Sequence, residues 1–305
     1  MIDLNVLKGK SFTRIIKGGI KYVKSMYGKF TLYISRPACK GITESDNVEI
    51  VVSLTSFPER INTIHLCVKT LLNQTYKPDR VLLWLAKSQF PNQEEDLPKA
   101  LLKLKKNGLS ICWCDDIRSY KKLIPAIEKY PDSAIITTDD DVYYGKNWLK
   151  GLVDSYKEHP EEIICYRAAK IEFDNGRFIR DDIQPYSEYK DATYLHQQTG
   201  VGGVLYPPHS LYKDILRRNA FMQLAPTNDD LWFWLMAVLN GRKIRILQGN
   251  TFKLYYIGET QKFSLTSIND HGEKLYYNQL EAIFEAYPKA LSILKKEYDC
   301  MEKNS

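Results

Sequence analysis

Three consecutive carboxylates, Asp139, Asp140 and Asp141, are the residues of this chain best suited to do chemistry. They follow residues 134–138, a run of small and β-branched residues that is typical of a buried strand. Ligands of open α/β sheets bind at the carboxyl ends of the strands, which is where these acids fall. Side chains alternate along an extended chain, so we expect Asp139 and Asp141 on one face and Asp140 on the other. Two hard oxygen ligands on one face suit Mg²⁺ or Mn²⁺ holding a diphosphate.

A buried strand that runs into Asp-Asp-Asp resembles the DxD motif of nucleotide-sugar-dependent glycosyltransferases with the GT-A fold. The resemblance implies a nucleoside-diphosphate-sugar donor, UDP-linked, with Mn²⁺ or Mg²⁺ on Asp139 and Asp141 and with Asp140 beside the donor. Some enzymes of this fold complete the metal shell with a C-terminal histidine, which makes His271 a third candidate ligand. The alternative for His271 is a lone surface histidine. Retaining enzymes also carry the motif, so the motif does not decide the stereochemistry of transfer.

The first expected strand, residues 48–55, leads into the sequence SLTSFPER at residues 53–60. In the GT-A enzymes this position cradles the base and ribose of the donor, which implies contacts from Thr55 and Ser56. Arg60 can meet a phosphate through two parallel N–H groups. The alternative is structural, because a serine followed by a proline also suits the start of the next helix.

Asp115 and Asp116 follow the third expected strand, residues 109–114. The resemblance implies that an acid here hydrogen-bonds the base or ribose, and the basic residues that follow favour this role over metal binding. A solvated loop is the alternative. Lys122 lies just beyond and is a candidate contact for the diphosphate, although the adjacent pair Lys121-Lys122 also suits a solvated helix face.

The second half of the chain contains two further pieces of the resemblance. The sequence GVGGVLYPP, residues 200–208, resembles a glycine-rich acceptor segment, in which the backbone can approach a sugar closely. Further along, Asp229 and Asp230 resemble the acidic pair at the start of a helix in inverting GT-A enzymes. This implies that Asp230 is the general base that deprotonates the acceptor hydroxyl, with Asp229 beside it. A helix cap is the alternative for Asp229, because acids also suit helix N-termini.

Strands and helices alternate through the part of the chain that carries these residues. The expected strands are 48–55, 81–86, 109–114, 134–138, 163–167 and 243–247, and the expected helices are 60–72, 97–107, 121–130, 147–158, 228–240 and 273–287. Such alternation favours right-handed crossovers and a largely parallel sheet. The prediction is therefore an α/β protein with a mainly parallel sheet, and the resemblance implies a GT-A-like Rossmann-type α/β/α sandwich. Its predicted parts are an N-terminal helix and linker (1–47), a nucleotide-sugar half (48–145), an acceptor and catalytic half (146–290) and a C-terminal tail (291–305).

Residues 1–30 contain seven lysines and arginines against one acid, and their apolar residues recur at helical spacing. A basic amphipathic helix suits an anionic membrane surface or docking on its own domain, and both alternatives stay open. The net charge of +6 also fits an anionic donor. No apolar run predicts a membrane span or a signal peptide, so the expected location is the cytoplasm, peripheral at the inner face of the cell membrane if the helix binds there.

The six cysteines form no C-x-x-C pair and no zinc-binding pattern, so we expect free thiols.

The motifs above, through their resemblance to GT-A enzymes, predict a glycosyltransferase that acts on a glycan or lipid-linked acceptor in bacterial surface-polysaccharide biosynthesis, such as lipopolysaccharide or capsule. One alternative is a metal-dependent phosphodiesterase or nuclease, which needs scattered acids and histidines and a basic track that the sequence does not clearly show. No nucleic-acid partner is therefore expected. The other alternative is a non-catalytic carbohydrate-binding protein on the same scaffold.

Overall fold

The computed structural model describes residues 26, 30–31, 40–43, 48–174, 177–182, 191–247, 255–258, 260 and 273–303 of the 305. The strands in these ranges are β1 (Ile50–Thr55), β2 (Arg80–Ala86), β3 (Leu109–Cys114), β4 (Ala134–Thr138), β5 (Val142–Tyr143), β6 (Ile163–Cys165), β7 (Ala168–Asp174), β8 (Arg177–Asp182), β9 (His196–Gln198), β10 (Val204–Tyr206), β11 (Ile244–Ile246) and β12 (Tyr255–Tyr256). The α-helices are α2 (Ile64–Leu71), α3 (Lys99–Leu102), α4 (Ile124–Lys129), α5 (Trp148–Glu158), α6 (Arg218–Leu224), α7 (Asp229–Leu239), α9 (Glu273–Ala286) and α10 (Pro288–Glu302). Two 3-10 turns, η4 (Arg118–Lys122) and η6 (Gly200–Gly202), bear on the site described below.

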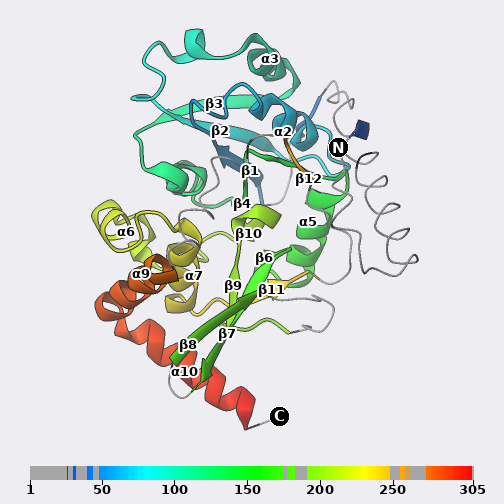
Figure 1. Cartoon of the computed structure of the whole chain (residues 1–305). Coiled ribbons are helices and arrows are strands. Elements are labelled where there is room, and N and C mark those ends of the chain that lie inside the picture. The colour runs from blue at the N-terminus through cyan, green and yellow to red at the C-terminus, as the bar shows by residue number, and fades with distance from the viewer. Residues whose placement is uncertain are drawn as a thin grey trace, which may run out of the picture.

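The central sheet of the described residues has the strand order β11-β6-β10-β4-β1-β2-β3 (Figure 1). Strand β1 runs parallel to β2 and β4, β2 runs parallel to β3, and β11 runs parallel to β6. Strand β10 is antiparallel to both of its neighbours, β4 and β6. The predicted α/β class with a mainly parallel central sheet is therefore confirmed. Because β1 and β4 are adjacent and parallel, the segments that follow them emerge at the same edge of the sheet.

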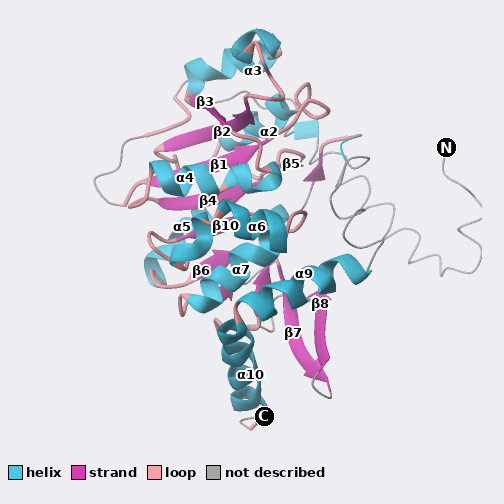
Figure 2. Ribbon diagram, turned by 90° about the vertical axis from the view of Figure 1, so that its left-hand side faces the viewer, coloured by secondary structure: helices cyan, strands magenta, loops and turns pink. Residues whose placement is uncertain are grey.

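Hydrophobic side chains cover both faces of the sheet, which explains why its strands are almost continuously apolar. On β1, Val51 belongs to one buried cluster, whereas Val52 and Leu54 belong to a second. The first cluster includes residues of α4, α6, α7, α9 and α10, and the second includes residues of α2, α3 and α5. Figure 2 shows α4, α6 and α7 lying over one face. The architecture is thus three layers, with helices on both sides of the sheet.

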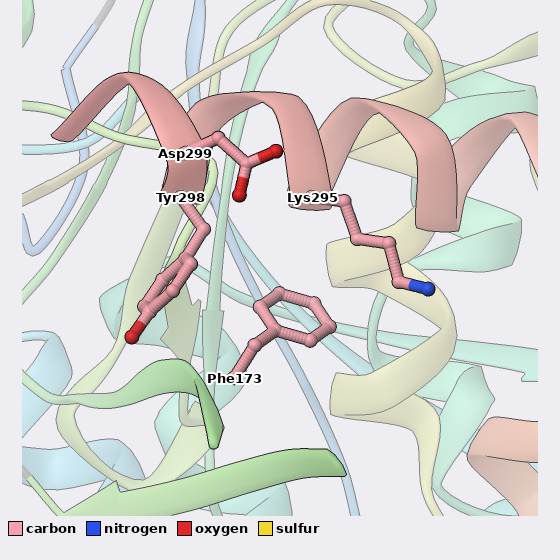
Figure 3. A pocket seen from close by; sticks show the side chains of 4 residues that line it. All are labelled: Phe173, Lys295, Tyr298 and Asp299. Carbon is pink, nitrogen blue, oxygen red and sulfur yellow. The ribbon is translucent and has the colours of Figure 1, made fainter. Parts of the chain in front are cut away.

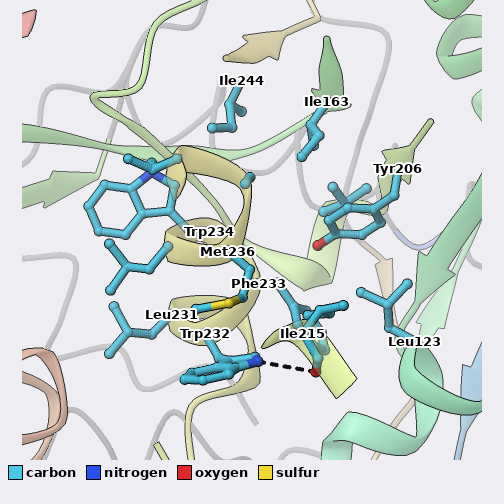
Figure 4. Close-up of a cluster of buried hydrophobic side chains, with 14 of the residues drawn as sticks. Leu123, Ile163, Tyr206, Ile215, Leu231, Trp232, Phe233, Trp234, Met236 and Ile244 are labelled. Carbon is cyan, nitrogen blue, oxygen red and sulfur yellow. Dashed lines mark hydrogen bonds between the residues drawn. The ribbon is translucent and has the colours of Figure 1, made fainter. Parts of the chain in front are cut away.

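Helix α7 is the most deeply buried helix of the first cluster after its opening turn. Trp232 and Trp234 are each 0% exposed, and both indole N–H groups find a carbonyl acceptor. Trp232 Nε1 donates to the carbonyl of Ile215 at 3.4 Å (Figure 4), and Trp234 Nε1 donates to that of Tyr194 at 2.9 Å. A helix that is apolar on all sides belongs in a core. Its packing therefore holds the polar first turn of α7 at a defined place.

Two predicted segments differ from the structure. The expected helix over 121–130 is a 3-10 turn that ends at Lys122, followed by α4, because Pro125 lacks the N–H and crowds the carbonyl four residues earlier. The expected helix over 97–107 is helix α3 followed by a 3-10 helix over Lys103–Asn107. Helix α10 runs through the predicted C-terminal segment 291–305 as far as Glu302.

The predicted N-terminal helix lies almost wholly outside the described residues, and the predicted domain boundaries stay predictions. Among the helices that the structure describes, none has the length and apolar character needed to cross a bilayer.

Candidate functional site

Lys122 lies at the centre of a buried cluster of charges in which the predicted donor and acceptor halves meet. Its Nζ is 3.3 Å from Asp139 Oδ1, 3.0 Å from Asp229 Oδ2 and 3.7 Å from Asp230 Oδ1. Lys122 ends the turn η4, Asp139 follows β4, and the two other acids form the first turn of α7. Only 7% of the Lys122 side chain is exposed, so the alternative of a solvated lysine is wrong, and its contact with a diphosphate stays a prediction.

The backbone beneath Lys122 is held by a polar residue of β1. Ser53 Oγ donates to the carbonyl of Lys122 at 2.6 Å, and Trp84 Nε1 of β2 donates to Ser53 Oγ at 3.1 Å. A serine inside an otherwise apolar strand needs such partners when it is buried. Ser53 thus anchors η4 to the sheet and directs Lys122 towards the carboxyl ends of β1 and β4.

Burial and charge oppose each other in this cluster. Burial alone lowers the pKa of Lys122, but Asp139, Asp229 and Asp230 outweigh it and raise that pKa well above the ordinary value, so the ammonium stays charged. Burial raises the pKa of Asp230 to about 6, although Lys122 acts in the other direction. The side chain of Asp230 is still 26% exposed, so the same carboxylate can be reached from solvent. A partly buried acid of this kind is a candidate proton acceptor near neutral pH.

Asn228, and not Asp229, caps helix α7. The Asn228 Oδ1 atom accepts a hydrogen bond from the backbone N–H of Leu231 at 3.1 Å, so the capping interpretation of Asp229 is wrong. Asp230 Oδ2 accepts from the backbone N–H of Gly200 at 2.8 Å. Asp230 Oδ1 is buried and accepts no hydrogen bond from the residues that the structure describes. The Asp230 carboxylate thus has one oxygen held by the backbone and one whose hydrogen-bonding capacity the described residues leave unused.

The glycine-rich segment packs directly against the charged cluster. A Cβ atom on Gly200 would lie 2.7 Å from Lys122 Nζ and 3.0 Å from Asp230 Oδ1, so a side chain there would displace both groups. Gly203 has a φ of +88°, which L side chains rarely adopt, and a Cβ atom there would collide with the indole ring of Trp148. Trp148 Nε1 also donates to the carbonyl of Gly202 at 2.8 Å. Glycine is thus required at position 200 because the backbone lies against Lys122 and Asp230, and at position 203 because of its φ and the neighbouring Trp148.

The acidic turn that follows β4, residues Asp139, Asp140 and Asp141, does not show the expected alternation of side chains. Asp140 Oδ1 accepts from Arg60 Nη1 at 2.6 Å, and Asp141 Oδ2 lies 3.2 Å from the same nitrogen. Asp139 instead faces Lys122, so Asp140 and Asp141 share one cation and Asp139 takes another. The reason is that β4 ends at Thr138, and the period of two applies only within a strand.

Three of the predicted donor contacts are engaged in supporting this turn and the strands next to it. Ser56 Oγ donates to Asp140 Oδ2 at 2.5 Å, and Thr55 Oγ1 donates to the carbonyl of Trp84 at 2.9 Å. Arg60 is 8% exposed and also donates to the carbonyl of Thr260 at 3.1 Å. Helix α2 begins at Ile64, so Ser56 does not cap it. In this structure Ser56 and Arg60 hold the acidic turn; their contacts to a donor stay predictions.

Asp115 and Asp116 follow β3 and have protein partners of their own. Asp115 forms an exposed ion pair with Arg218 at 2.8 Å. Asp116 accepts from Lys121 Nζ at 2.8 Å and from the backbone N–H of Arg118 at 2.9 Å. Burial raises the pKa of Asp116, but these two donors outweigh it and lower the pKa below the usual value. Both acids thus stabilise the loop before η4, and their contact with a base or ribose stays a prediction.

The donor atoms around the acidic turn fit a divalent ion that the substrate helps to hold. Within the described residues, no group of three or more His, Cys, Asp or Glu side chains could hold a metal by itself. Mg²⁺ and Mn²⁺ commonly bind through one or two carboxylates and complete their shells with phosphate oxygens and water. Asp139, which is 29% exposed, and Asp141 supply the kind of ligand that such a partial shell needs, and their binding of an ion stays a prediction. His271 lies outside the described residues.

A separate hollow of about 280 Å³ lies between β7 and α10 (Figure 3). Phe173 and Tyr298 line it with their rings at 68° and their centroids 5.5 Å apart, and Lys295 and Asp299 add one charge of each sign. None of the predicted site residues lines this hollow. It is therefore not part of the candidate site.

The sequence analysis missed two residues that position the site. Ser53 supports Lys122, and its signal was a hydroxyl in the middle of an otherwise apolar stretch, residues 50–54. Tyr144 accepts a hydrogen bond from the backbone N–H of Asp139 at 3.0 Å and is buried. The tyrosines after the acidic motif carried no evident signal, because an aromatic residue there also suits the core.

No family model matches this chain, and no curated protein matches its sequence. Among solved structures, residues 1–349 of TarS from S. aureus are similar at 15% identity with a TM-score of 0.46, over 79% of this chain and 73% of that one. The mannosyltransferase PcManGT from Pyrobaculum calidifontis, in complex with GDP-Man and Mn²⁺, is similar at 10% identity with a TM-score of 0.49, over 89% and 74% of the two chains. GalNAc-T7 with UDP, GalNAc and Mn²⁺ is similar at 12% identity with a TM-score of 0.43, over 67% of this chain and 43% of that one. Likenesses at this level do not carry a substrate or a mechanism over to this chain.

Proposed function

We propose that this chain is a divalent-metal-dependent glycosyltransferase that uses a nucleoside-diphosphate sugar, UDP-linked, as its donor. The observation that carries the proposal is the convergence on Lys122 of Asp139, at the carboxyl end of β4, with Asp229 and Asp230, at the start of α7. Transfer between two substrates needs a donor-binding group and a proton acceptor within reach of one another. The cluster offers both, and Gly200 of the glycine segment packs directly against it.

On the donor side, Asp139 and Asp141 would hold Mn²⁺ or Mg²⁺ together with the diphosphate. When bound, such an ion neutralises charge on the leaving diphosphate as a Lewis acid. Ser56 and Arg60 keep Asp140 and Asp141 in place through the contacts given above.

On the acceptor side, Asp230 acts as the general base of an inverting displacement. The acceptor hydroxyl oxygen forms a bond to the anomeric carbon, the bond from that carbon to the diphosphate oxygen breaks, and the hydroxyl proton moves to Asp230. The nucleoside diphosphate leaves with the electron pair of the broken bond. The Asp230 carboxylate receives the proton, while the N–H of Gly200 fixes its orientation through Oδ2. Asp229 holds the ammonium of Lys122 beside it.

The acceptor in this proposal is a glycan or a lipid-linked glycan of bacterial surface-polysaccharide biosynthesis. The basic segment 1–30 supports an acceptor at an anionic membrane surface. A two-metal phosphodiesterase is not favoured, because the described residues contain no cluster of three metal ligands.

Calorimetric titration of UDP with and without Mn²⁺ tests the donor assignment. UDP should bind tightly only with Mn²⁺, and Asp139→Asn and Asp141→Asn should each remove that dependence. Asp154→Asn is a matched control, because Asp154 is an exposed acid on α5 that pairs only with Lys150 among the described residues. Mn²⁺-independent binding of UDP, or full Mn²⁺-dependent binding in both site variants, would show that the proposal is wrong.

A further inference from the structure

The ammonium of Lys122 and a divalent ion would compete for the same carboxylate. Lys122 Nζ lies 3.3 Å from Asp139 Oδ1, and Asp139 is one of the two acids proposed to hold the metal. The side chain of Lys122 is 7% exposed, so its charge is stabilised by the carboxylates around it and not by water. A divalent ion on Asp139 would be repelled by this ammonium, and the repulsion is strong where little water screens it.

A diphosphate removes this conflict. Its negative charge can bind the ion on one side and the ammonium on the other, so that both cations have a partner. In this arrangement the ammonium turns from Asp139 to the diphosphate beside Gly200, where a Cβ atom would lie 2.7 Å from the position that Lys122 Nζ now holds. Asp229, 3.0 Å from Nζ, keeps the ammonium in the site as it turns.

We propose that Lys122 is a positioning residue that makes binding of the divalent ion depend on the nucleotide diphosphate. In the free protein its ammonium holds Asp139. When the diphosphate binds, the ammonium contacts it and leaves Asp139 to the ion. This inference rests on the proposed function and adds the order in which the ligands bind. The metal binds together with the nucleotide and does not bind alone.

The neighbouring basic residues do not have this geometry. Lys121 is equally buried, at 2% exposed, but it pairs with Asp116 on the other side of the turn. Arg60 holds Asp140 and Asp141 and also donates to the carbonyl of Thr260, so it is tied to the acidic turn itself. Lys122 is the cation that bridges the candidate metal ligand Asp139 and the first turn of α7 in the described structure.

The test measures Mn²⁺ affinity by calorimetry and by electron paramagnetic resonance, on the full chain, with Mn²⁺ alone and with Mn²⁺ plus UDP. The wild type should bind Mn²⁺ weakly alone and at least about tenfold more tightly with UDP. Lys122→Met should bind Mn²⁺ alone at least about tenfold more tightly than the wild type, because its competitor is gone. Lys121→Met removes the same charge from the adjacent position and should bind Mn²⁺ as the wild type does.

Lys122→Gln provides a second variant for the case in which Lys122→Met does not fold because the buried acids lack a partner. Glutamine also removes the charge but can still donate a hydrogen bond to Asp229. Should the folded Lys122 variant bind Mn²⁺ alone no more tightly than the wild type, while both bind Mn²⁺ plus UDP, the inference is overturned and the proposed function stands. If neither the wild type nor any variant binds UDP with Mn²⁺, the proposed function is overturned and the inference falls with it. If Lys121→Met and Lys122→Met gain equally in affinity for Mn²⁺ alone, the effect comes from net charge, and the inference about Lys122 is also overturned.

Discussion

Replacing Asp230 with asparagine removes the proton-accepting carboxylate but keeps nearly the same side-chain shape. The amide oxygen of asparagine can still accept the hydrogen bond that Gly200 N–H donates to Oδ2 at 2.8 Å. The amide nitrogen then takes the place of Oδ1, the buried oxygen that lies 3.7 Å from Lys122. An amide cannot take a proton from a hydroxyl near neutral pH. The substitution therefore removes the general base and leaves the backbone contact in place.

The expected loss is large in turnover and small in donor affinity. A general base contributes about 10²–10⁴-fold to the rate, or about 2.7–5.4 kcal/mol of activation free energy. Donor affinity should change by less than about 1 kcal/mol, because Lys122 keeps its closer contacts, to Asp139 at 3.3 Å and to Asp229 at 3.0 Å. The free energy of unfolding should rise slightly, because burial in this site disfavours the ionised carboxylate that is removed.

Release of UDP and formation of glycosylated product at saturating donor measure the turnover, and calorimetry measures the donor affinity. Asp229→Asn is the matched comparison, because Asp229 pairs with Lys122 but accepts no hydrogen bond from Gly200. It should lose less turnover than Asp230→Asn. Turnover of Asp230→Asn within about tenfold of the parent would refute the assignment. So would a product that keeps the anomeric configuration of the donor by NMR, since a single displacement inverts it.

Four further predictions follow from charge, packing and backbone geometry. The pKa of Asp230 is raised to about 6 in the folded protein, so kcat/KM should fall as the pH drops through that value. In the metal-free protein, Asp230 should contribute to the free energy of unfolding below about pH 4, and this contribution should be lost as the pH rises through about 6. Urea unfolding at several pH values checks this. Arg60→Met should cost about 3–5 kcal/mol of unfolding free energy because it leaves buried acids without their cation, whereas Lys105→Met, at an exposed pair, should cost less than about 1 kcal/mol. Gly203→Ala should cost about 1–3 kcal/mol in the same assay because its φ is +88°. A protein without residues 1–30 should lose co-sedimentation with anionic liposomes, at about 1 kcal/mol per basic residue in the full chain; equal sedimentation of both proteins would contradict this.

The sequence alone determined the layers of this protein and the place of its acidic turn. Strands that are buried on both faces need nearly continuous runs of apolar and β-branched residues, and such runs predicted strands at 48–55, 81–86 and 134–138 without any tertiary information. An acidic motif that follows such a run must emerge at the carboxyl edge of a parallel sheet.

Only the tertiary structure decided which acid meets which cation. Lys121 and Lys122 are adjacent lysines with the same intrinsic charge and flexibility, yet one pairs with Asp116 and the other lies among Asp139, Asp229 and Asp230. Their difference comes from Ser53, which fixes the backbone of η4 from a strand 69 positions away in the chain. Local periodicity reports which face of an element a residue occupies, but not which distant element packs against that face. For buried charges that second question dominates, because the stability of each ion depends on the partners that folding brings to it.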